Sequence, residues 1–221
     1  MITPANRHLE ENVTVSPGIK SEYDARNFGR NWAAARGYNP DQMATFAAAL
    51  FQKWGAEALS TQKFEDHFQG FVQAKTSIRS QRQTYGDQEW KLRDDWILET
   101  VKHLAIVNIA GLAGSTALYA NLKNDPSTAL KFSIGLFGLG LLLAVVDLFT
   151  NARAHYLNGL RANSLRDNAH MAESWDALVA VATAKYSSDE GDLCTQCAEV
   201  AGALSAFAAA IGVVLLIVHV I

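Results

Sequence analysis

The chain has 221 residues, of which 49% are hydrophobic and 19% charged, and its formal net charge at pH 7 is −3. This slightly acidic balance excludes a globally basic surface for nucleic acid, so any site for an anion must be local. No strand-like alternation of useful length occurs, and the apolar residues recur at helical spacing, so the expected fold class is all-α.

Residues 1–20 are polar, contain Pro4, Pro17 and Gly18, and show no sustained apolar period. This composition predicts a flexible N-terminal arm. It also lacks the apolar stretch of a cleavable signal peptide, so we expect internal spans to direct membrane insertion.

Residues 21–86 have the pattern of a small helical bundle. Gly37 is placed to end a first helix, and Asn39 followed by Pro40 is a strong helix-start signal. A third helix carries aromatic residues at helical spacing: Phe64, Phe68 and Phe71. Such a stripe is more often a packed core than a cofactor site, and it predicts three helices that bury their aromatic faces against one another.

Residues 87–150 are expected to form an interfacial helix followed by a transmembrane hairpin. The segment Asp87–Glu99 keeps helical spacing and leads into a first span, Lys102–Leu122. The second span is expected at Ala129–Thr150, after a turn at residues 124–126. Trp90 and Trp96 would lie near the lipid headgroups, where tryptophan is enriched.

Residues 151–198 read as a polar helical segment that ends in an acidic loop, Ser187–Asp192. Residues 199–221 form the last span. Its 22 residues from Val200 contain no Asp, Glu, Lys or Arg, and as a helix they would extend about 33 Å, enough to cross the hydrocarbon core of a bilayer. The chain is therefore expected to be an integral membrane protein with three transmembrane helices and a small N-terminal cytoplasmic helical bundle.

The positions of Lys and Arg predict the orientation of the spans. Basic residues are concentrated before the first span and between the second and third, whereas the hairpin has only Lys123 and Lys131. By the positive-inside rule the bundle and residues 151–198 face the cytoplasm, and the C-terminus lies outside.

Polar residues within apolar helices tend to face a partner or water. One side of each span carries such residues, and the candidates for a pore are Asn108, Ser115, Ser133, Asp147 and Glu199. A single three-span chain could satisfy these groups internally. A symmetric homo-oligomer could instead align them around an axis, with a ring of carboxylates at its mouth.

The last span has a side of small residues that would allow close helix packing: Gly202, Ala206, Ala209 and Gly212. In the bundle, Lys75, Arg79 and Arg82 fall on one helix face in a stretch without acidic residues. This stripe could bind a phosphate-bearing ligand, face water or contact anionic lipid.

No catalytic spacing is present: the chain has no Gly-rich phosphate loop, no His-Glu-x-x-His and no nucleophile elbow. Cys194 and Cys197 form an isolated Cys-x-x-Cys, which lacks the two further ligands of a zinc site. We therefore expect neither an enzyme nor a metal or other cofactor.

The arrangement of a helical cytoplasmic domain, a hairpin of spans reading HLAIVNIAGLAGSTALYANL and LKFSIGLFGLGLLLAVVDLF, a cytoplasmic helix and a last span resembles the channel-forming effectors of Hailong-type anti-phage defence. The resemblance implies a homotetrameric channel of the bacterial inner membrane. An oligonucleotide or cyclic nucleotide, made by a partner nucleotidyltransferase, would hold it closed, and its loss would depolarise the membrane. The alternative from the sequence is a membrane-tethered adaptor or sensor without a pore.

Overall fold

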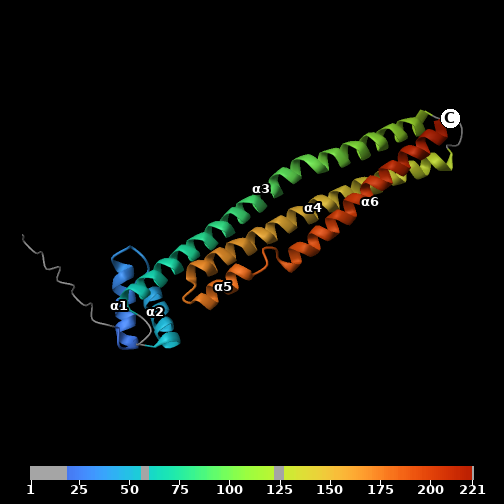
Figure 1. The fold of residues 1–221 in the computed structure, drawn as a ribbon. Coiled ribbons are helices and arrows are strands. Elements are labelled where there is room, and N and C mark those ends of the chain that lie inside the picture. Colours follow the sequence, from blue (N-terminus) through green and yellow to red (C-terminus); the bar gives the residue numbers. More distant parts are fainter. Residues whose placement is uncertain (1–18, 56–59, 122–126, 221) are drawn as a thin grey trace, which may run out of the picture. The chain divides into compact units, whose positions relative to one another are not determined.

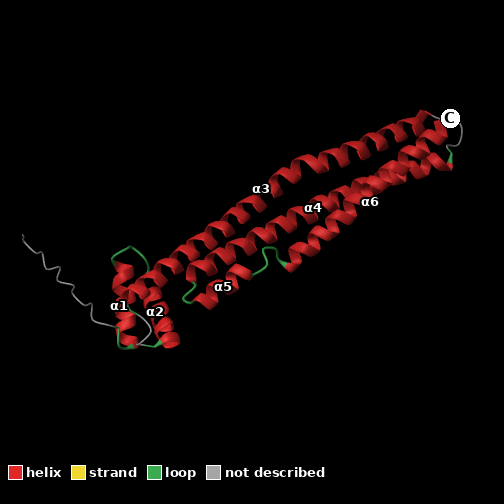
Figure 2. Ribbon diagram, in the orientation of Figure 1, coloured by secondary structure: helices red, strands yellow, loops and turns green. Residues whose placement is uncertain are grey.

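The computed structural model describes residues 19–55, 60–121 and 127–220, and all regular secondary structure in these ranges is helical (Figures 1 and 2). This confirms the all-α prediction. Most of the expected N-terminal arm and the expected hairpin turn lie outside the described residues. The helices are α1 (Glu22–Ala34), α2 (Pro40–Trp54), α3 (Thr61–Asn121), α4 (Thr128–Met171), α5 (Trp175–Thr183) and α6 (Asp189–Val220).

Three stretches are long and apolar enough to cross a membrane, as the sequence predicted. They are Lys102–Asn121 in α3, Thr128–Met171 in α4 and Asp189–Val218 in α6. The chain divides into two compact units. The first unit comprises the chain up to Ser77 with Ala169–Ala180, and the second unit comprises Ile78–Asn168 with Val181–Ile221.

The first unit is held together by aromatic rings. Helix α2 starts where the sequence predicts, because Asn39 accepts hydrogen bonds from the backbone of Asp41 and Gln42. At the start of α1, Ser21 accepts one from the backbone of Asp24. The predicted aromatic stripe of α3 is buried, and Phe71 stacks on Phe46 of α2 with ring centroids 4.0 Å apart. The same two rings contact Trp175 of α5.

The second unit is built from α3, α4 and α6, which lie side by side along its length (Figure 1). Helices α3 and α4 are antiparallel, because residues further along α3 contact residues earlier in α4. Gly86 faces Ala162, Asn108 faces Gly140, and Gly111 faces Phe137. Helix α6 pairs with α4 in the same antiparallel manner, because Ser133 bonds to Gly212 and Gly140 to Ser205. The three helices therefore run up, down and up.

Two boundaries differ from those expected. Helix α3 runs through Gly86 without a break, and a Cβ there would lie 3.3 Å from the Ala162 side chain, so this glycine permits close approach of α4. The expected acidic loop is partly helical, since α6 begins at Asp189. Its acidic residues fall in the first turn, where the helix dipole favours negative charge.

Candidate functional site

The polar candidates of the spans are packed inside the chain. Asn108, Ser115 and Ser133 have no exposed surface, and Asp147 is 4% exposed. Asn108 donates to Ser205 Oγ at 3.3 Å, and Ser205 donates in turn to the carbonyl of Gly140 at 2.7 Å. We call this line of contacts, with Ser133 and Asp147, the polar seam.

Close approach of α6 to α4 depends on small residues. The Ser133 hydroxyl donates to the carbonyl of Gly212 at 2.9 Å. A Cβ on Gly212 would lie 3.0 Å from the Phe137 ring, and one on Gly202 would lie 2.8 Å from Asp147 Oδ2. Ala209 is buried as well, whereas Ala206 is exposed. Most of the small side of α6 is therefore occupied by helices of the same chain.

Glu199 differs from the other pore candidates because it is exposed. Among the residues that the structure describes, Glu199 has no ion-pair or hydrogen-bond partner. It is also the last acidic residue of α6, since none follows it in the sequence. Glu199 is thus the one pore candidate that a neighbouring copy or an ion could reach directly.

The expected basic stripe is not a continuous exposed surface. Arg79 is exposed, and Lys75 donates to Gln42. Arg82 is only 1% exposed and donates to the carbonyls of Val181, Ala182 and Ala184 at 2.6 to 3.0 Å. Arg82 therefore does not lie on the exposed face that the sequence suggested for a ligand. The reason is that α5 ends beside it, and an arginine that bonds to the free carbonyls of a helix end is buried in doing so.

Arg82 belongs to a second group of buried polar residues that the sequence did not reveal. Its guanidinium carbon lies 3.8 Å from the ring centroid of Tyr186. Seven residues further along α3, Glu89 contacts His155 of α4, with 2.8 Å between Oε2 and Nδ1. Glu89 also hydrogen-bonds to Tyr85.

The electrostatics of this group follow from its burial. Burial raises the pKa of Glu89, but hydrogen bonds from His155 and Tyr85 outweigh this effect and hold the pKa below its usual value. Burial and the neighbouring carboxylate raise the pKa of Tyr85.

The sequence contains one signal of the buried side of α4, which is the seven-residue spacing of Ser133, Gly140 and Asp147. Extended by one step beyond the span, this spacing leads to Ala154, which is buried on α4.

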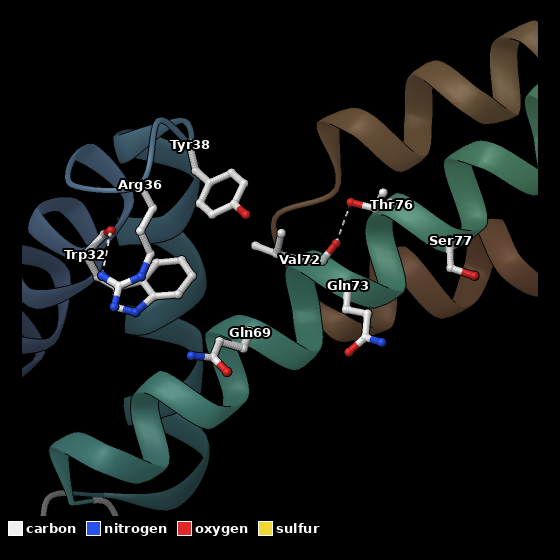
Figure 3. Close-up of a pocket in the computed structure, with 8 residues that line it drawn as sticks. All are labelled: Trp32, Arg36, Tyr38, Gln69, Val72, Gln73, Thr76 and Ser77. Carbon is white, nitrogen blue, oxygen red and sulfur yellow. Dashed lines mark hydrogen bonds between the residues drawn. The ribbon is translucent and has the colours of Figure 1, made fainter.

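A groove opens on the surface of the first unit, with a volume of about 580 Å³. One side is formed by Trp32, Arg36 and Tyr38 at the end of α1, and the other by two turns of α3 (Figure 3). The α3 residues that line it are Gln69, Val72, Gln73, Thr76 and Ser77. We call this feature the groove.

The C-terminal end of α1 positions the aromatic side of the groove. Gly37 takes a φ of +73°, which suits glycine, and Tyr38 N–H donates to the carbonyl of Ala33 at 3.0 Å. This is a Schellman cap, and it turns the chain so that Tyr38 stacks on Trp32. Arg36 lies over the same indole, 4.6 Å from its centroid.

No group of three or more metal-ligating side chains occurs in the part of the chain that the structure describes. Both cysteines are free thiols; Cys197 is exposed and Cys194 partly so. In comparisons with known proteins, the chain matches no protein-family model, no curated sequence and no solved structure.

Proposed function

We propose that this membrane protein is a cation channel that forms between copies of the chain and is controlled by a ligand on its helical domain. The observation that carries the proposal is the exposure of Glu199, which has no partner among the described residues. In a symmetric assembly such a residue becomes a ring of carboxylates, and rings of this kind select cations.

The packing of the polar seam favours an ion path between copies of the chain over an ion path through a single copy. Asn108, Ser133 and Ser205 are buried and hydrogen-bonded within the protomer, so they leave no polar lumen of their own. The outward faces of the same helices expose large apolar side chains, among them Phe132, Leu142, Phe149, Leu204 and Phe207. Contacts between copies, with a tetramer as the expected number, would use these faces.

The proposal includes a role in anti-phage defence, which is based on the resemblance of the whole chain to the channel-forming effectors of Hailong-type defence. An oligonucleotide or cyclic nucleotide from a partner nucleotidyltransferase would hold the channel closed, and its loss would depolarise the bacterial inner membrane. Of the basic stripe, the exposed Arg79 is the residue best able to meet a phosphate, because Arg82 is committed to carbonyl groups.

A second candidate is a membrane-tethered adaptor or sensor without a pore. The observation that favours it is the same packing of the spans: buried polar groups paired inside one chain and an apolar surface toward lipid are what a stable membrane anchor requires. The two candidates differ in one measurable property, which is ion conductance.

Planar-bilayer recording of the purified full chain separates them. The channel proposal predicts cation-selective currents, and Glu199→Gln should lower the selectivity for cations because one charge is lost from each subunit. Asp147→Asn is the matched control, since Asp147 is buried in the seam and should not alter selectivity. A folded oligomer that passes no current, with or without nucleotide, would leave the adaptor as the surviving candidate.

Orientation is tested separately with reporter fusions. Fusions after Lys123 and Ile221 should report an external position, and a fusion after Lys185 a cytoplasmic one. A cytoplasmic signal at Ile221 would contradict the proposed topology.

A further inference from the structure

The groove of the first unit has the composition of a small-ligand site rather than of a solvated surface. Its one charged lining residue is Arg36, and none of the eight lining residues is acidic. An anion would therefore enter it without a repelling charge on the wall.

Arg36 is held in position by contacts that leave most of its donors available. Its Nη1 donates to the carbonyl of Trp32 at 3.4 Å, and the guanidinium lies over the indole ring (Figure 3). The described residues offer its remaining N–H groups no other hydrogen-bond partner. A guanidinium fixed in this way presents a planar pair of donors, which matches the oxygens of a carboxylate or phosphate.

Tyr38 supplies a flat surface beside that cation. Its ring stacks on Trp32 with 5.7 Å between centroids and an interplanar angle of 16°, and 43% of the residue stays exposed. A planar ligand can add a further layer to this stack, because offset stacking of rings is favourable.

The α3 side of the groove adds uncharged hydrogen-bonding groups. Gln69 and Gln73 are one helical turn apart and exposed, and the described part of the chain gives their amides no hydrogen-bond partner. The Ser77 hydroxyl is in the same situation. In the aromatic wall, Trp32 Nε1 is buried without an acceptor. The α3 side of the groove thus places amide and hydroxyl groups without partners among the described residues on the same groove as Arg36.

We propose that the groove binds a planar ring that carries an oxyanion, with Arg36 on the carboxylate or phosphate, Tyr38 stacked on the ring, and Gln69 and Gln73 bonded to its polar edge. This site is distinct from Arg79, and it does not depend on whether the spans conduct ions.

The test uses the purified full chain in detergent and four water-soluble probes. Nicotinate and phenyl phosphate carry the two oxyanions on flat rings, nicotinamide is the neutral match of nicotinate, and cyclohexanecarboxylate is an anion without a flat ring. Binding is followed by saturation-transfer NMR and titration calorimetry. We expect nicotinate, phenyl phosphate or both to bind at least about tenfold more tightly than the neutral and non-planar probes. Whichever of the two binds identifies the oxyanion.

Matched variants locate the site. Arg36→Gln should weaken binding of the anionic probe about tenfold, whereas Arg30→Gln, an exposed arginine of α1 paired with Asp41, should leave it unchanged. Tyr38→Phe should retain binding and Tyr38→Ala should lose it, with Tyr23→Ala as the exposed-tyrosine control. Circular dichroism checks that each variant is folded. Equal affinity for nicotinate and nicotinamide, equal losses in the Arg36 and Arg30 variants, or no binding of either flat anion to the folded protein would overturn the proposal.

Discussion

Asn108 of α3 and Ser205 of α6 are 97 positions apart in the sequence, and they share a hydrogen bond of 3.3 Å in the buried centre of the second unit. The same Asn108 amide donates to its own helix at Leu104. Its Oδ1 is buried without a partner and lies against Gly140. All three helices of the second unit thus meet at Asn108.

Gly140 should be intolerant of even the smallest side chain. A Cβ at this position would lie 2.2 Å from Asn108 Oδ1, so Gly140→Ala must displace the Asn108 amide from its bond to Ser205 and should destabilise the fold by about 1–3 kcal/mol. Unfolding in mixed detergent micelles measures this. Gly138→Ala is the control, since a Cβ there meets nothing within 4 Å. Equal effects in the two variants would contradict the packing argument.

Ser205→Ala removes two bonds between helices, the one received from Asn108 and the one donated to Gly140. Interhelical hydrogen bonds in membranes contribute modestly, so the expected loss is about 0.6–1.7 kcal/mol. Thr116→Val serves for comparison, because the exposed Thr116 hydroxyl bonds only to carbonyls of its own helix. The same unfolding assay applies, and a Thr116 variant that loses as much as the Ser205 variant would count against a role for the seam.

Glu89 should make stability depend on acid pH. Its pKa is held below the usual 4.5 in the folded chain by His155 and Tyr85, despite the opposing effect of burial. A carboxyl with a lowered folded-state pKa stabilises the fold above its unfolded pKa, and this contribution is lost as the pH falls through the folded value. Melting temperatures between pH 7 and pH 3 should therefore fall less steeply in Glu89→Gln than in the native chain.

The control for that series is Glu99→Gln, an exposed carboxyl on the same helix. Its melting curve should follow the native one at every pH. A Glu89→Gln protein with the native pH profile would show that the Glu89–His155 contact does not control acid stability.

Arg82→Ala should free the segment between α5 and α6. The variant leaves the carbonyls of Val181, Ala182 and Ala184 without their shared charged donor, a loss of about 1.5–3 kcal/mol for bonds to a charged group. Trypsin should then cut faster after Lys185. Arg79 is exposed and lies three residues away, so Arg79→Ala should keep the native cleavage rate. Faster cleavage in the Arg79 variant as well would contradict a specific role for the bonds from Arg82.

The spans, a helix start and one core face could be predicted from the sequence alone, because each depends on residues close together in the chain. An uncharged run of 22 residues can be recognised from length and hydropathy, and all three spans were found this way. The cap at Asn39 depends on residues within one helical turn, and the period of the aromatic stripe in α3 identifies the face of that helix that is buried in the core.

Only the tertiary structure decided what covers each face. The helical period places Asn108, Ser133 and Asp147 on particular sides of their helices, but the same period fits a water-filled pore and a packed neighbour equally well. Arg82 looked like a partner of Arg79 until the end of α5 was found beside it, and Glu89 and His155 come together across 66 residues. Angular position on a helix is a local property of the sequence, whereas burial depends on the other helix that the fold brings against it.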